Sequence, residues 1–333
     1  MVRRLSAFLP AAVLACAGGA EVTAPPAYAK TMVLSLAGLP PLDALREGSY
    51  EAWMVDRQGV FHSAGRFAPS VSVALTLPEA VADPVSVIIT VEPPFDSDAQ
   101  PSKQHLLKGA FSGANATLRV VGALTQGDLA LRERPGQFTI FTPSDNAING
   151  YPSHEEAGIW LFNMAPFDTP QGDMWVRLTQ LQAGWIYEGW VVRDVGLPGA
   201  VWFSYGKFLP DQTGAVSARD DQGWGAFSGV LDFASEQSEE FPGGDFISNP
   251  LHLPVPGDLL LPLNLTEKTA AGGSRWTHVI TIEPAWNKGE GLATERPFFL
   301  APYSDAVGSG GPGLPRTITY RASVIPSGSA VLR

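Results

Sequence analysis

The sequence has a single cysteine, Cys16, among 333 residues, so no disulfide within the chain is available to hold the fold. It also lacks any continuous apolar stretch of about 18 residues, the length that a membrane-spanning helix needs. Basic residues are few, 22 against 33 acidic ones, and the net charge of −11 leaves nothing to neutralise phosphates. These shortages exclude a disulfide-stapled scaffold, a helical membrane span and a nucleic-acid partner.

Catalytic and metal-binding signatures are equally scarce. No serine stands in a Gly-x-Ser-x-Gly setting, and no Gly-x-Gly-x-x-Gly run links a strand to a helix. The histidines are scattered singly, without the spacing of a metal site. We therefore expect no enzyme activity and no cofactor, and we expect none of the histidines to bind a metal ion. The histidines are His62, His105, His154, His252 and His278.

Long stretches of helical periodicity are missing as well. In their place the chain has 29 prolines, 35 glycines and many short runs in which apolar and polar residues alternate. Such runs, bounded by turn residues, are typical of β-strands. An apolar content of 45% is sufficient for a buried core. The composition therefore predicts an all-β protein.

Four short blocks occur twice in the same order, which predicts an internal duplication. The clearest pair is Tyr50-Glu51-Ala52-Trp53 and Tyr187-Glu188-Gly189-Trp190. Because each block lies in an alternating run, we expect equivalent strands with Trp53 and Trp190 in equivalent core positions. The blocks and their second copies are residues 50–53 and 187–190, 64–67 and 205–208, 87–93 and 278–284, and 106–112 and 298–304.

The spacing of the blocks predicts the domain organisation. The offset is 137 residues from Trp53 to Trp190 but 191 from Glu92 to Glu283, so the second copy carries an insertion of about 50 residues. We predict two tandem antiparallel β-sandwich domains related by duplication. Their boundaries are residues 31–125 and 126–320, with the insertion at 209–277 and a C-terminal tail at 321–333.

The N-terminus resembles an export signal. A short basic segment, Met1–Arg4, precedes the apolar run 5–15, which ends in Val13-Leu14-Ala15-Cys16. That ending resembles the lipobox of bacterial lipoproteins, in which the cysteine is lipidated. We expect a signal peptide at 1–16, a lipid anchor on Cys16 and a flexible tether at 17–30. The alternative is an ordinary signal peptide cleaved near Ala29, which preserves export and removes the anchor.

The repeated blocks resemble the extracytoplasmic domain of anti-sigma factors of the anti-sigma-K type. That domain has a Tyr/Trp, Glu and Trp strand, a Gly-x-Phe hairpin, and a Val-Thr-Val-Glu-Pro strand followed by a Pro-rich loop. The resemblance extends over most of residues 31–305 as two copies. The chain departs from the family in having no sigma-binding segment and no transmembrane helix. The resemblance implies a β-sandwich-like module on the outer side of a membrane.

An exported carbohydrate-active protein, one that binds or hydrolyses glycosides, is an alternative. The repeated acids Glu51, Glu92, Glu188 and Glu283 raise the hydrolysing form, because a glycoside hydrolase uses a pair of carboxylates. Glu92 and Glu283 each precede a proline at a strand end, where a carboxylate accepts hydrogen bonds from turn amides. Both copies retain all of these acids, so we expect them to serve the fold of each domain. We interpret Tyr50, Glu51, Trp53, Glu92, Tyr187, Glu188, Trp190 and Glu283 as a structural signature.

The insertion is the stretch where we expect the binding surface to lie. It is rich in acidic residues and contains Trp224, and loops of that kind carry function more often than strands do. Its carboxylates could also bind calcium, although their spacing matches no EF-hand. The residues proposed for the binding surface are Asp220, Asp221, Trp224 and Asp245. The leading hypothesis is a non-enzymatic interaction module of the cell envelope, with an unknown protein or glycan partner, and a purely structural envelope protein is the other alternative.

Overall fold

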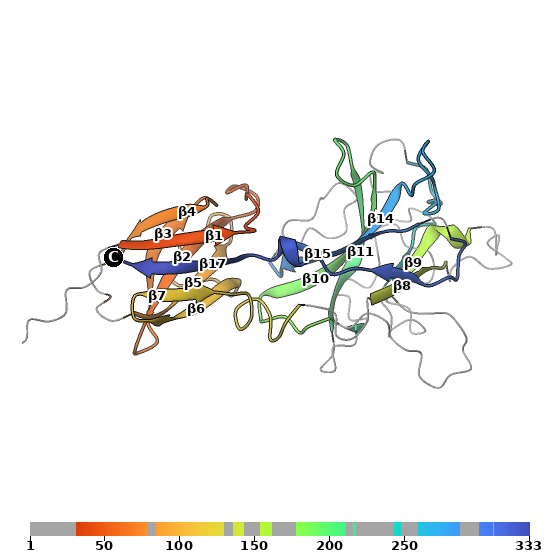
Figure 1. Cartoon of the computed structure of the whole chain (residues 1–333). Helices are drawn as coiled ribbons and strands as arrows, with labels where there is room; N and C mark the ends of the chain where they lie inside the picture. The colour runs from red at the N-terminus through yellow and green to blue at the C-terminus, as the bar shows by residue number, and fades with distance from the viewer. Residues whose placement is uncertain are drawn as a thin grey trace, which may run out of the picture.

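The computed structural model describes residues 31–78, 81, 84–129, 136–142, 154–161, 178–210, 216–217, 243–247, 259–286, 300–308 and 310–333. In these residues the regular elements are β-strands and two short 3-10 helices, and every strand pair in a sheet is antiparallel. The predicted all-β class is confirmed. Two β-rich units lie beside each other along the molecule (Figure 1).

The first unit is one eight-stranded sheet in the order β3-β2-β5-β6-β7-β17-β1-β4. Most of its strands come from the N-terminal part of the chain; β1 and β7 alternate in burial, whereas the central strands β2 and β5 are buried on both faces. They are β1 (Thr31–Ala37), β2 (Ser49–Asp56), β3 (Phe61–Phe67), β4 (Ser72–Thr76), β5 (Pro84–Glu92), β6 (His105–Ser112) and β7 (Asn115–Leu118).

The remaining strand, β17 (Ser327–Leu332), comes from the C-terminus. It lies between β1 and β7, pairing Met32 with Leu332 on one side and Leu118 with Gly328 on the other. Figure 1 shows this blue strand among the red and yellow strands of the first unit. We expected a tail at 321–333, and the structure has a strand there. β17 forms because the facing edges of β1 and β7 would otherwise have no backbone hydrogen-bond partners.

The second unit contains a five-stranded sheet in the order β12-β11-β10-β14-β15 and a four-stranded sheet in the order β13-β9-β8-β16. A bridge between Tyr303 and Tyr320 and a bond from the Ser304 amide to the Thr319 carbonyl link the two sheets. The strands are β8 (Gly136–Ile140), β9 (Gly158–Trp160), β10 (Trp185–Arg193), β11 (Val201–Pro210), β12 (Val216–Ser217), β13 (Gly243–Asp245), β14 (Trp276–Pro284), β15 (Leu300–Ala306) and β16 (Arg316–Ile318). The 3-10 helices are η1 (Glu155–Ala157) and η2 (Ala322–Val324).

The strand orders of the two units correspond almost completely. In the first unit β3-β2-β5-β6 continues into β7-β17-β1-β4, and in the second β11-β10-β14-β15 continues into β16-β8-β9-β13. β17 therefore occupies in the first unit the place that β8 occupies in the second. In sequence, β8 follows β7 and β17 follows β16. If the correspondence of strands, and not the boundary at residue 125, defines the repeats as β1–β8 and β9–β17, the last strand of each repeat lies in the sheet of the other.

The two faces of the central strands differ in what they bury. Tyr50, Ala52 and Met54 alternate along β2 into the main hydrophobic core. The equivalent Tyr187 and Val191 do so in β10. Trp190 packs on the opposite face with Val192 and Val279 in a small cluster of its own. Period-two alternation thus places the aromatic residues of each repeated block on opposite sides of the sheet.

Direct hydrogen bonds join the two units. The Trp185 indole nitrogen donates to the carbonyl of His105 at 3.0 Å, and the Gln104 side chain donates to the carbonyl of Gly184 at 2.8 Å. Backbone bonds add Gln126 to Gln180 and Gln182 to Leu124, each at 2.9 Å. These bonds lie at the boundary that the sequence places near residue 125.

Some predictions concern residues beyond those described. The leader, Cys16 and the tether lie outside the described residues, as do Asp220, Asp221 and Trp224 of the insertion. Asp245 lies in β13, the short strand that pairs with β9. Residues 259–265 form no strand, and Leu263 and Leu265 of this segment are buried in the core.

Candidate functional site

The repeated signature residues form the same hydrogen-bonded cluster in each unit. In the first unit the Trp53 indole nitrogen donates to the Thr90 hydroxyl at 3.0 Å, and that hydroxyl lies 3.4 Å from the carbonyl oxygen of Glu51. In the second unit Trp190 donates to Thr281 at 2.9 Å, and the Thr281 hydroxyl lies 3.4 Å from the Glu188 carbonyl. Trp53 and Trp190 therefore occupy equivalent sites.

The glutamates of the Tyr-Glu-x-Trp blocks accept hydrogen bonds from the next strand of their hairpins, β3 in the first unit and β11 in the second. Ser63 donates its hydroxyl to Glu51, and Ser204 donates to Glu188 at 2.7 Å. Each serine also accepts the amide of the glycine two residues later, at 3.1 Å in both units. Those glycines, Gly65 and Gly206, have φ of 118° and 112°, a region that favours glycine. They lie opposite β-bulges at Ala52/Trp53 and Gly189/Trp190.

The tyrosines of the blocks anchor loops in matching ways. The Tyr50 hydroxyl donates to the carbonyl of Pro40 and the Tyr187 hydroxyl to the carbonyl of Thr179, both at 2.8 Å. Tyr50 stacks on Phe67 with ring centroids 5.8 Å apart, and Tyr187 stacks on Phe208 at 5.9 Å. The pairing of Tyr and Phe between blocks explains why both recur in the sequence.

Glu92 is buried at the end of β5 and has several hydrogen-bond donors around it. The Ser102 amide lies 3.0 Å and the Trp53 indole nitrogen 3.3 Å from its carboxylate, and the Thr90 hydroxyl also donates to it. Burial raises the pKa of Glu92, and these hydrogen bonds oppose that shift. Glu283 is equally buried at the end of β14. The residues that would correspond to Ser102 fall within 287–299, outside the described part of the chain.

The carboxylates do not form an accessible acid/base pair. The Thr90 hydroxyl lies within hydrogen-bonding distance of both the Glu51 carbonyl and the Glu92 carboxylate, so the two residues are near each other. Both are buried, however, and Arg66 binds Glu51 at 2.9 Å. Glu188 and Glu283 belong to the other unit. A sugar ring would have to displace the hydrogen bonds of Glu51, Glu92 and Glu188, and Glu283 is fully buried, so this arrangement suits a structural role.

Sequence reasoning missed two kinds of residue in this cluster. They are the serine of the Ser-x-Gly sequence and the threonine of β5 or β14, one of each in both units. Both left a signal in the repeats. Ser63 and Ser204 precede their glycines at the same spacing, and Thr90 and Thr281 stand two residues before their glutamates. A comparison of every position within the repeated blocks would have identified them.

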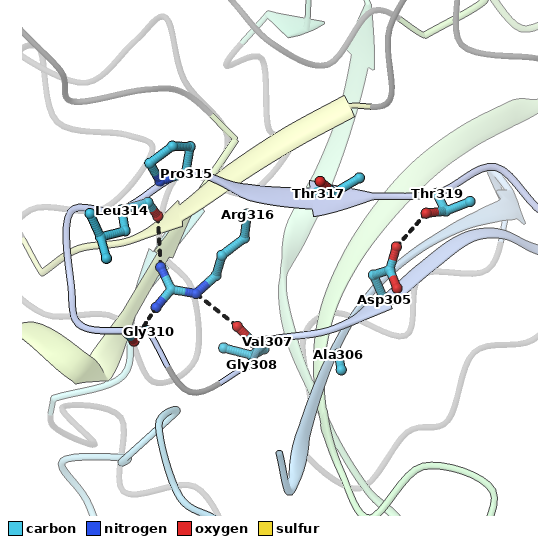
Figure 2. A pocket seen from close by; sticks show the side chains of 10 residues that line it. All are labelled: Asp305, Ala306, Val307, Gly308, Gly310, Leu314, Pro315, Arg316, Thr317 and Thr319. Atoms are coloured by element: carbon cyan, nitrogen blue, oxygen red, sulfur yellow. Dashed lines mark hydrogen bonds between the residues drawn. The ribbon is translucent and has the colours of Figure 1, made fainter. Parts of the chain in front are cut away.

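A shallow pocket of about 440 Å³ lies on the second unit between β15 and β16 (Figure 2). The Arg316 guanidinium extends from β16 beneath the loop and donates to the carbonyls of Val307 and Leu314, both at 2.7 Å. It also donates to Gly311 at 2.9 Å and to Gly310. Because these carbonyls use its donors, Arg316 supports the loop and does not present a free anion site. Burial lowers its pKa.

The pocket rim retains a few polar groups. Thr319 donates its hydroxyl to Asp305, and Thr317 is exposed beside them. These groups could exchange hydrogen bonds with a small polar ligand. Among the described residues, no group of three or more His, Cys, Asp or Glu side chains is arranged to hold a metal ion. The calcium possibility rests on acidic residues of the insertion, of which Asp220 and Asp221 fall outside the described part.

The most exposed aromatic side chain of the first unit is Phe95, at 82% exposure. Its φ of 61° lies in the left-handed region, which is costly for a bulky residue. Arg66 holds the loop by binding the Asp96 carboxylate at 2.7 Å while it binds Glu51. At the same offset that relates Glu92 to Glu283, the second unit has Trp286, which packs partly buried against the core. The first unit therefore presents outward an aromatic residue that the second unit keeps inward.

In the part of the chain that the structure describes, no helix is long and apolar enough to cross a membrane. Comparison with curated proteins gave no match, and comparison with solved structures gave none either. One family model matches the chain, described as "Anti-sigma-K factor rskA, C-terminal", over residues 7–105. That match begins in the apolar run 5–15 and ends at the start of β6. The first repeat is thus similar to the C-terminal domain of anti-sigma-K factors.

Proposed function

We propose that the chain is a non-enzymatic interaction module on the outer side of a bacterial membrane, held there by lipid on Cys16. The similarity of residues 7–105 to the C-terminal domain of an anti-sigma-K factor supports an extracytoplasmic position. The lipobox-like ending at Cys16 supports the anchor.

The observation that carries the interaction role is the use of the repeated polar residues. Glu51, Glu92 and Glu188 accept hydrogen bonds from their own sheets, so the signature builds a rigid scaffold. A scaffold of this kind presents loops. Phe95 is held outward on such a loop, in a strained conformation that the Arg66–Asp96 bond supports. Strain of this kind is often retained at binding sites, and exposed aromatic residues are frequent binding anchors.

The anchor is tested by Cys16→Ala. The expected result is loss of the lipid from the chain and its release from the membrane fraction, read by mass spectrometry of the mature N-terminus. A chain cut near Ala29 would retain export and remove the anchor. An intact Met1 terminus on the mature chain would contradict both.

The interaction surface is tested with a photo-crosslinking amino acid at position 95 in cells. Position 71 is the matched control, because Val71 is equally exposed, at 82%, on the same unit. We expect a discrete adduct from position 95 that is absent from position 71. Identical adducts from both positions, or none from position 95, would show that Phe95 is not the contact. A further arm removes 218–242, within the insertion, and an adduct lost only there would move the surface to the insertion.

A further inference from the structure

Each unit has a slot that is filled by a strand from the other repeat. In the first unit the slot lies between β1 and β7 and contains β17. In the second unit it lies between β9 and β16 and contains β8. The chain is therefore two repeats that exchange their last strands reciprocally, as two subunits do in a domain-swapped dimer.

The two exchanged strands are held with different strength. β8 buries Phe138 and Ile140 completely, and the Phe138 ring contacts the His278 ring with centroids 4.4 Å apart. β17 buries only Ala330 fully, and its other side chains are exposed or half-buried. Main-chain pairing with β1 on one side and β7 on the other therefore supplies most of the interactions that keep β17 in the sheet. Segments with little buried apolar surface open locally at a low free-energy cost.

The connection to β17 permits its departure from the slot. Arg321 is fixed to the second unit, where its amide donates to Pro302 at 2.7 Å and its guanidinium to Ser304 at 2.7 Å. From there residues 322–326 lead directly into β17. A short connection of this kind favours exchange between copies.

We propose that the slot between β1 and β7 is a strand-acceptor site that takes β17 from a second copy of this chain. In the resulting dimer each chain donates its β17 and accepts the other's. Every pair of the ladder, from Met32 with Leu332 to Leu118 with Gly328, is reproduced between copies. The balance between closed monomer and exchanged dimer then depends on the concentration of the second copy against the effective concentration of the chain's own strand. This inference does not depend on the proposed function.

The test mixes two full-length chains that both carry Cys16→Ser. One bears Val33→Cys and an affinity tag, and the other bears Val331→Cys, because Val33 and Val331 are register partners. After incubation at high concentration the mixture is oxidised and covalent heterodimers are measured. The control replaces the second chain with one that bears Leu197→Cys, an exposed residue on the hairpin between β10 and β11. The expected yield is at least about ten-fold above the control, and a yield equal to the control would overturn the proposal.

A second variant separates strand exchange from chance collision. A Cβ on Gly328 would lie 2.5 Å from the Ser35 carbonyl oxygen, so Gly328→Val disturbs the fit of β17 in any slot. Added to the Val331→Cys chain, it should reduce the heterodimer to the control level while the second unit stays folded. A yield unaffected by Gly328→Val would also overturn the proposal, since it would show that the link forms outside the slot.

Discussion

Gly189 and Tyr205 replace, in the second unit, the residues Ala52 and Ala64 of the first. A Cβ on Gly189 would lie only 1.7 Å from the Tyr205 ring, so the missing side chain makes room for the tyrosine. The Tyr205 hydroxyl in turn shares a hydrogen bond of 2.8 Å with Nε2 of His278, which stands where the first unit has Val87. Three small or apolar core residues of the first unit are thus replaced in the second by Gly189, Tyr205 and His278. The glycine leaves space for the Tyr205 ring, and Tyr205 and His278 form a buried hydrogen-bonded pair.

The close contact of Gly189 with the Tyr205 ring predicts that the effects of mutating these two residues on the free energy of unfolding are not additive. Gly189→Ala should destabilise the native chain by about 2–3 kcal/mol, because the rigid ring cannot move aside. In the Tyr205→Ala background the same change should cost less than about 0.5 kcal/mol, since the pair then matches Ala52 and Ala64. Chemical denaturation of the single and double variants measures the difference. Equal costs in the two backgrounds would show that the two units are not equivalent at this position.

His278 makes stability depend on pH. Burial lowers its pKa from 6.5 to about 3, so the folded chain keeps it neutral while the unfolded chain protonates it below pH 6.5. The unfolded state then binds more protons, and stability falls as the pH drops from about 6.5 toward 3. The contribution of His278 to this slope is up to about 1.4 kcal/mol per pH unit.

His278→Val, which installs the residue of the first unit, should flatten that acid slope. The free energy of unfolding is measured at several pH values between 3 and 7 for both proteins. His62→Ala serves as the control, because His62 is partly exposed beside Asp56 and has no comparable burial. If the native and His278→Val slopes are parallel, the histidine is not neutral in the folded core.

At the scale of elements, the sequence predicted the strands that carry large alternating residues. β2, β5, β10 and β14 are rich in buried Tyr, Trp, Val and Ile on both faces, and their duplication made them recognisable in the sequence. β17 gave no such signal, because Ser327-Gly328-Ser329-Ala330 has one small buried residue and lies in a Gly- and Ser-rich region. Its partners are also at the other end of the chain. Local pattern cannot predict a pairing that main-chain bonds alone specify.

The unequal burial of β8 and β17 predicts unequal protection of their amides. In native-state hydrogen exchange, the amides of β17 should exchange at least about ten-fold faster than those of β8. Both strands occupy the same place in their sheets, so the comparison isolates the side-chain contribution. Amides of β5, which is buried along most of its length, provide the internal reference for global unfolding. Equal protection of β8 and β17 would contradict the view that β17 is held mainly by its backbone.

At the scale of the whole molecule, the two units are joined in three ways. The chain passes from β7 into the second unit and returns from β16 into the first, and direct bonds such as Trp185 to His105 link the surfaces between them. Each unit also holds a strand of the other repeat. The predicted second domain, 126–320, contains all the strands of the second unit, whereas the predicted tail, 321–333, contains the strand that completes the first.

The central claim, that the last strand of each repeat completes the other unit, is tested most directly by cross-strand disulfides in one chain. With Cys16→Ser in the background, one variant carries Val33→Cys and Val331→Cys, and another carries Gln137→Cys and Thr317→Cys, which are register partners in the second unit. Mass spectrometry of linked peptides after mild oxidation reads the outcome. The structure predicts near-complete linkage in both variants and little with Val33→Cys and Leu197→Cys. Linkage of residues 137 and 317 without linkage of 33 and 331 would mean that the C-terminus is a free tail.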